Sequence, residues 1–192
     1  MGKIILASSS PRRSDILKKM NIDFEVLPSS YVEQHDKTDF SYEFVEDLAY
    51  NKALYVARDL HISEKKHTVI GADTIVVIDN KILGKPHNYE DAFSMLKMLA
   101  GRTHFVVTGL AVIDSDTMKS KITSETTYVT FSDLTDEQIK YYIENFNPYD
   151  KAGAYGIQEL PEGFVKSFEG EFDNVIGLPS KSLRKLLNEV TL

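Results

Sequence analysis

The feature that most limits the fold of this chain is the apolar run over residues 69–78, which one carboxylate, Asp73, interrupts. The run is rich in Val and Ile, which predicts a largely buried strand. An ionised carboxylate in such a strand costs several kcal/mol unless a cation, a metal ion or strong donors compensate it. Gly71 and Ala72 would also let a ligand approach the backbone. We therefore expect a functional site around Asp73, the alternative being that it caps a turn at the wet end of the strand.

Residues 4–13 join a short apolar strand to a turn with anion-binding chemistry. Three serines are followed by Pro11 and by the adjacent Arg12 and Arg13. Ser10 suits the N-cap of a helix and Pro11 its first position, so backbone N–H groups and two guanidinium groups are expected to converge. This predicts a phosphate site, although the glycines of a Walker loop are absent. The alternative is a capped surface helix with solvated charges.

The remaining sequence alternates between strand and helix patterns. Strands are predicted over residues 4–8, 22–26, 69–78, 81–83, 103–113 and 121–131, with a turn at Asp79-Asn80. Helices are predicted over 11–20, 41–60, 89–100, 135–146 and 183–190, and a loop over 28–39. Gly101 is placed to cap the third helix, and Thr135 with Gln138 fits a capping box opening the fourth. The order predicts an α/β fold with a mixed, partly antiparallel sheet flanked by helices.

Composition excludes several functions. The 192 residues suffice for one sizeable core or two lobes around a cleft, and the lack of cysteine excludes disulfides, zinc–thiolate sites and thiol catalysis. A formal charge of −7 argues against a nucleic-acid partner. No apolar run approaches a membrane span and no secretory signal is visible, so we expect a cytoplasmic protein without a membrane partner.

Further charged residues are weaker candidates. Lys52 falls in the middle of the apolar stripe of its helix, where snorkelling to water is slightly favoured over reaching a cleft. Glu33 lies in a polar loop, and Lys85 is held between Gly84 and Pro86. The pair 150–151 precedes a glycine-rich turn. The five histidines show no metal-ligand spacing, and we interpret them as surface or structural residues.

Six motifs in order resemble the Maf family of nucleoside triphosphate pyrophosphatases and span essentially the whole chain. They are Ala7-Ser8-x-Ser10-Pro11-Arg12-Arg13, Gly71-Ala72-Asp73-Thr74, Gly84-Lys85-Pro86, Gly101-Arg102-Thr103-His104, residues 150–158, and Gly177-Leu178-Pro179. The resemblance implies a single domain over residues 1–192 with a central cleft, similar to the inosine triphosphate pyrophosphatase architecture and often a homodimer. It also implies hydrolysis of a nucleoside triphosphate to the monophosphate and pyrophosphate with a divalent cation, Mg²⁺ or Mn²⁺.

Matched by position, Asp73 corresponds to the family's proton acceptor. Arg12, Thr74 and Gln158 correspond to three positions that separate its branches, and all three resemble the branch acting on dTTP and UTP. The family usually has glycine after the Gln, whereas this chain has Glu159. That departure puts base selectivity in question more than catalysis.

The chemistry of phosphoanhydride cleavage fits these residue types. Arg12 and Arg13 would bind phosphates together with Ser8, and Lys52 and Lys85 would add positive charge at the reacting groups.

Glu33 and Asp73 could share a divalent cation, and Asp73 could instead accept the proton of the attacking water. Thr74 and Gln158 offer a hydroxyl and an amide to a pyrimidine. We expect an enzyme that hydrolyses dTTP, UTP or related pyrimidine nucleotides. The alternatives are the same chemistry on another base, and a non-enzymatic nucleotide-sensing regulator of septum formation.

Overall fold

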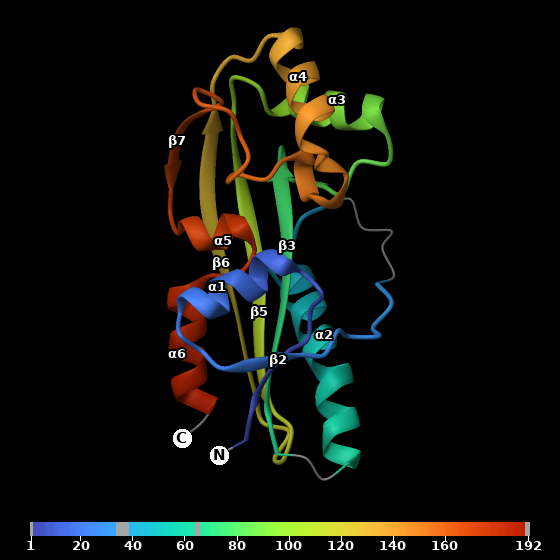
Figure 1. The fold of residues 1–192 in the computed structure, drawn as a ribbon, viewed down its shortest axis with the longest axis vertical. Coiled ribbons are helices and arrows are strands. Elements are labelled where there is room, and N and C mark those ends of the chain that lie inside the picture. The colour runs from blue at the N-terminus through green and yellow to red at the C-terminus, as the bar shows by residue number, and fades with distance from the viewer. Residues whose placement is uncertain (1, 34–38, 64–65, 191–192) are drawn as a thin grey trace.

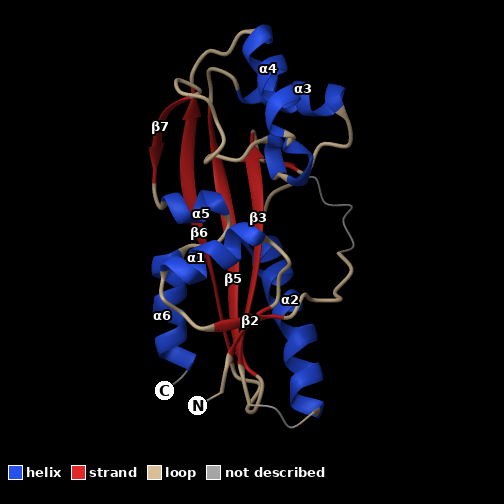
Figure 2. Ribbon diagram, viewed as in Figure 1, coloured by secondary structure: helices blue, strands red, loops and turns tan. Residues whose placement is uncertain are grey.

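The computed structural model describes residues 2–33, 39–63 and 66–190, and its core is a mixed sheet flanked by helices (Figures 1 and 2). The sheet has seven strands: β1 (Ile4–Leu6), β2 (Phe24–Val26), β3 (Thr68–Ile78), β4 (Lys81–Leu83), β5 (Thr103–Asp114), β6 (Ser120–Phe131) and β7 (Val165–Glu169). The helices are α1 (Pro11–Lys19), α2 (Tyr42–Ile62), α3 (Tyr89–Leu99), α4 (Asp136–Phe146), α5 (Phe172–Ile176) and α6 (Ser180–Val190). Two short 3₁₀ helices, η1 (Pro148–Asp150) and η2 (Ala152–Ala154), follow α4.

The strand order is β2-β1-β3-β5-β6-β7, with β4 pairing β3 outside this path. β1 runs parallel to both β2 and β3, and the other pairs are antiparallel. The predicted α/β class with a mixed, partly antiparallel sheet is therefore confirmed.

One edge of β3 is paired at its two ends and open between them. β1 pairs β3 as far as Ile70, and β4 pairs it from Val76 onward. Residues 71–75, including Asp73, have a strand partner on the β5 side alone. This gap lies at the carboxyl end of the parallel β1–β3 pair, where open α/β sheets commonly bind ligands.

Helices cover both faces of the sheet. One face carries α1, α5 and α6 toward the chain termini and α3 and α4 toward the opposite end (Figure 1). α2 packs on the other face, where Gly71 and Gly109 allow a close approach. A Cβ at Gly109 would lie 2.2 Å from the carbonyl oxygen of Val45, and one at Gly71 2.3 Å from that of Ala49.

Most of the turns and helix caps predicted from the local sequence are present. Asp79 and Asn80 have φ values of 51° and 61°, as a tight hairpin turn requires, and the capping box of Thr135 and Gln138 is present. Gly101 also has a positive φ of 69°, but its N–H donates to Ser132 rather than back to α3.

Some predictions at the first turn and in the C-terminal third were wrong or incomplete. β1 ends at Leu6, and α1 begins at Pro11 without a side-chain cap from Ser10, whose N–H instead donates to Ser8 Oγ at 3.2 Å. The sequence pattern did not predict β7, α5 or the 3₁₀ helices. Of the predicted 28–39 loop, residues 34–38 lie outside the described residues. Within the described ranges, no helix has the length and apolar character to cross a membrane.

Candidate active site

Two adjoining cavities have volumes of about 510 and about 390 Å³, and the larger is lined by Asp73, Thr74 and Ile75 of the unpaired stretch of β3. Seven residues line both cavities: Ser10, Arg12, Arg13, Glu33, Lys52, Lys85 and Asp150. The larger one also has an extended apolar wall, formed by Leu48, Ile75, Val76, Leu83, Val106, Tyr155 and Ile176 among others. The smaller one, by contrast, is bounded by the serine-rich turn over residues 8–10. The pair of cavities thus joins an apolar space to a cationic one.

Arg13 is fixed by three hydrogen bonds from one guanidinium group. It donates to Gly177 O at 2.8 Å, to Ser8 Oγ at 3.0 Å and to Thr74 Oγ1 at 3.2 Å. Burial lowers the pKa of Arg13, and the nearby Asp73 carboxylate partly offsets this effect. The side chain remains a cation at any physiological pH, because an arginine begins from so high a pKa. The predicted residues Ser8, Arg13 and Thr74 therefore form one connected group.

Thr74 contacts protein groups that the sequence analysis did not single out. Its hydroxyl lies 3.0 Å from Thr108 Oγ1 and 3.4 Å from Gly177 O, and it also accepts the hydrogen bond from Arg13. Thr108 in turn donates to Asn174 O at 3.0 Å. Nothing in the local sequence of Thr108 or Asn174 marks them, because Thr108 meets Thr74 only through the pairing of β5 with β3 and Asn174 meets Thr108 only through the placement of α5.

Lys52 points into the site rather than snorkelling to water. Its ammonium group contacts Oδ1 of Asp73 and Oε1 of Glu33, and its side chain is 16% exposed. Odd-numbered residues of β3 face α2, which brings Asp73 opposite this lysine. The slight preference for snorkelling was wrong, because the two carboxylates that attract the ammonium lie far from Lys52 in the sequence.

The residues Glu33 and Asp73 have the chemistry of a divalent-cation site. Both carboxylates touch the same ammonium group, so both can reach one cation position. Carboxylate oxygens suit Mg²⁺ and Mn²⁺, which complete their coordination with water and phosphate oxygens. The described residues include no cluster of three or more His, Cys, Asp or Glu side chains, so further ligands would have to come from substrate and water.

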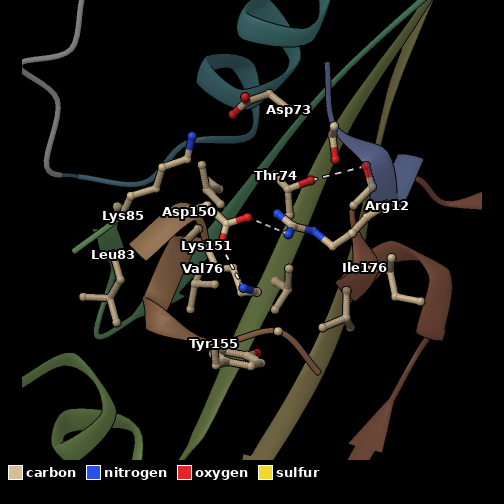
Figure 3. A pocket seen from close by; sticks show the side chains of 18 of the residues that line it. Arg12, Asp73, Thr74, Val76, Leu83, Lys85, Asp150, Lys151, Tyr155 and Ile176 are labelled. Carbon is tan, nitrogen blue, oxygen red and sulfur yellow. Dashed lines mark hydrogen bonds and ion pairs between the residues drawn. The ribbon is translucent and has the colours of Figure 1, made fainter. Parts of the chain in front are cut away.

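Arg12 is held at the junction of the cavities by Asp150, as Figure 3 shows. Its Nη1 donates to Asp150 Oδ2 at 2.8 Å, and Lys151 Nζ donates to Oδ1 of the same carboxylate at 2.8 Å. Partial burial disfavours the charged carboxylate, but the hydrogen bonds from Lys151 and Arg12 outweigh it and lower the pKa of Asp150 to about 2. Asp150 is thus ionised throughout the physiological range.

Two of the predicted residues line the larger cavity without a partner among the described residues. Lys85 is exposed, makes no ion pair to any of these residues, and points toward the side of the cavity where Asp73 lies (Figure 3). Gln158 is also exposed and makes no hydrogen bond within the described chain. Both side chains are available to a ligand.

A buried histidine supports the apolar wall. His104 Nε2 lies 2.7 Å from Tyr155 Oη, and its ring packs edge-on against Phe131. Burial lowers the pKa of His104 to about 4, and its Nδ1 has no hydrogen-bond partner in the described part of the chain. His104 is structural, as the sequence analysis expected.

The site therefore combines an apolar cavity for a ring, four cations at its mouth and along the adjoining cavity, and two carboxylates on one ammonium group. Such a set is typical of α/β proteins that bind a phosphorylated ligand bearing an apolar or aromatic moiety. The chain belongs to the Maf family, whose model, described as Maf-like protein, matches residues 3–190.

Two similar curated proteins carry the same name. The dTTP/UTP pyrophosphatase of Ruminiclostridium cellulolyticum is 42% identical over 99% of this chain and 97% of its own length. That of Alkaliphilus oremlandii is 48% identical over 93% of this chain and 91% of its own length. A crystal structure of a nucleoside-triphosphatase / dITP/XTP pyrophosphatase from Mycobacterium abscessus overlaps 67% of this chain and 72% of that one, at 16% identity and a TM-score of 0.39.

Proposed function

We propose that this chain hydrolyses dTTP and UTP to the nucleoside monophosphate and pyrophosphate. The observation that carries the proposal is the shared boundary of the two cavities, where Arg12, Arg13, Lys52 and Lys85 all lie. An apolar cavity joined to a cationic one matches a base joined to a triphosphate. The name shared by relatives at 42–48% identity supports the same reaction.

The reaction needs charge neutralisation, an oriented water molecule and an acceptor for its proton. Arg12, Arg13 and Lys85 bind phosphate oxygens. The water oxygen forms a bond to the α phosphorus while the bond from that phosphorus to the bridging oxygen breaks, and pyrophosphate leaves with the bridging oxygen. Asp73 accepts the proton of the water.

Glu33 and Asp73 are the residues that would hold a divalent cation. A bound Mg²⁺ or Mn²⁺ ion supplies neutralisation of the phosphate charge and polarises the phosphoryl group. Lys52 contacts both carboxylates, so it would compete with a bound cation for them and add positive charge beside the phosphates. The two roles of Asp73, as base and as ligand, compete, and they are separable by experiment.

Gln158 is the group we assign to base recognition. Its amide carries both a donor and an acceptor, which a pyrimidine's N3–H and carbonyl oxygens can pair. Thr74 contributes mainly by holding Arg13, since its hydroxyl already contacts three protein groups. The homodimer implied by the family resemblance stays a prediction.

The test is pyrophosphate release from the common nucleoside triphosphates with Mg²⁺ or Mn²⁺, comparing wild type, Asp73→Asn and Asp23→Asn. Asp23 is an exposed carboxylate outside the cavities, so its variant controls for the loss of a surface charge. We expect release from dTTP and UTP, lowered by about 10²–10⁴-fold in Asp73→Asn, as removal of a general base does.

Calorimetric titration with Mn²⁺ separates the two roles of Asp73. If an inactive Asp73→Asn variant binds Mn²⁺ with unchanged affinity, Asp73 is the general base. If the variant loses Mn²⁺ affinity together with activity, Asp73 is a metal ligand. Full activity in Asp73→Asn refutes the mechanism. Nucleotide binding without pyrophosphate release from any nucleotide would favour the sensor.

A further inference from the structure

Four charged side chains form a continuous network from the segment after Gln158 to the junction of the cavities. Glu159 Oε2 lies 3.1 Å from Lys151 Nζ, which lies 2.8 Å from Asp150 Oδ1. Asp150 Oδ2 then accepts from Arg12 at 2.8 Å, so that Asp150 stands between the two cations (Figure 3). Two positive and two negative charges make this network neutral.

Lys151 is the fixed centre of the network. Its side chain is 8% exposed, and its ammonium group reaches three acceptors: Asp150, Glu159 and the carbonyl oxygen of Asn147, the last at 3.3 Å. Two of these contacts are hydrogen bonds, to Asp150 and Asn147, and the contact with Glu159 is an ion pair. The stem of Lys151 lies against Gly156, where an added Cβ would be 2.9 Å from Cε. The position of the ammonium group therefore depends on both carboxylates.

Asp150 transmits that position to Arg12. Each of its two oxygens accepts from one cation, so a shift toward Lys151 weakens the bond to Arg12. This coupling between Lys151 and Arg12 is electrostatic and needs no conformational change in the backbone. Arg12 lines both cavities, where the base and the phosphates of a nucleotide would meet.

Glu159 acts through its side chain rather than through the backbone. Its φ is not positive, so a glycine is not required at this position. Loss of its charge would leave the network with one excess positive charge beside a buried ammonium group, a costly arrangement. Asp150 would then be drawn toward Lys151.

We propose that Glu159 is a positioning residue for nucleotide recognition, acting through Lys151 and Asp150 to orient Arg12. The proposal rests on the proposed function, because it assigns Arg12 to the nucleotide. It predicts an effect on substrate affinity rather than on the chemical step.

The test compares Glu159→Ala, Glu159→Gln and the matched control Glu162→Gln, which alters an exposed carboxylate on the same segment that has no ion pair to a described residue. KM and kcat are measured with UTP and dTTP, and Kd with uncleavable α,β-methylene UTP. Glu159→Ala should raise KM and Kd by about three- to tenfold with kcat within about twofold, the range expected for coupled charges in one network. Glu159→Gln should give KM and Kd values between those of the wild type and Glu159→Ala, because its amide keeps a polar oxygen beside Lys151.

The proposal is overturned if Glu159→Ala matches Glu162→Gln in KM and Kd, or if its loss falls on kcat alone. Binding of the analogue does not require hydrolysis, so the two hypotheses fail separately. A wild-type chain that binds the analogue more tightly than Glu159→Ala, yet releases no pyrophosphate, would refute the proposed reaction and support the positioning role. Absence of nucleotide binding in the wild type would refute both.

Discussion

Replacing His104 by glutamine is expected to flatten the pH dependence of the stability of this protein between pH 7 and pH 5. His104 is 1% exposed, and burial lowers its pKa from 6.5 to about 4. In the unfolded chain the imidazole takes up a proton near pH 6.5, whereas in the folded chain it stays neutral until about pH 4. The unfolded state therefore binds more protons in this window, and stability falls as the pH is lowered.

The magnitude follows from the two pKa values. A pKa shift of this size lowers the free energy of unfolding by about 3 kcal/mol below pH 4, and about 2 kcal/mol of this is lost between pH 7 and pH 5. Glutamine cannot titrate, so the variant should lack this part of the slope. It also loses the edge-on packing with Phe131, which lowers stability by a similar amount at every pH and leaves the slope unaffected.

The measurement is urea unfolding followed by circular dichroism at several pH values from 7 to 5. The control is His87→Gln, which alters an exposed histidine whose ring makes no hydrogen bond to a described residue. The diagnostic quantity is the difference in slope between each variant and the wild type, since carboxylates titrate equally in all three. A His104→Gln protein that loses as much stability as the wild type between pH 7 and pH 5 would refute the assignment of a neutral buried imidazole.

Two further predictions concern the stability of the protein at low pH and the close packing of α2 against the sheet. Because the pKa of Asp150 is lowered to about 2, its contribution to stability is present above the ordinary value of 3.8 and is lost as the pH falls toward 2. Asp150→Asn should therefore make the acid unfolding curve shallower over that range. Gly109→Ala should destabilise the fold by about 1–3 kcal/mol in urea unfolding, because the new Cβ meets Val45 O at 2.2 Å. Gly84→Ala is the control, since nothing lies within 4 Å of its Cβ, and an equal loss there would contradict the steric explanation.

The sequence predicted those parts of the fold that depend on neighbouring residues. The hairpin turn at Asp79 and Asn80 and the capping box at Thr135 are local hydrogen-bond and backbone preferences, and each formed as expected. α1 likewise begins at Pro11, although Ser10 does not cap it. By contrast, β7 and α5 were missed, because neither carries a long periodic pattern of its own.

The candidate site was predictable where a residue conflicts with its own element. Asp73 in an apolar strand and Lys52 in an apolar stripe are such conflicts, and the two side chains are in contact. The direction of Lys52 was misjudged, since it depends on how α2 crosses β3. Lys151 and Tyr155 had no comparable signal, because their roles arise from contacts with Glu159 and His104 across turns and strands.

The open edge of β3 explains how one ligand can meet residues on both faces of a sheet. Asp73 faces α2 and Lys52, whereas Thr74 faces Arg13 and α5, since neighbouring side chains of a strand point in opposite directions. In a strand paired along both edges, the sheet itself would separate these two groups. Because β1 pairs β3 only as far as Ile70 and β4 pairs it only from Val76, the cavity passes around the unpaired edge and reaches both groups. A ligand held by Arg13 on the Thr74 side can therefore also reach Asp73 and Lys52 on the other side of the strand.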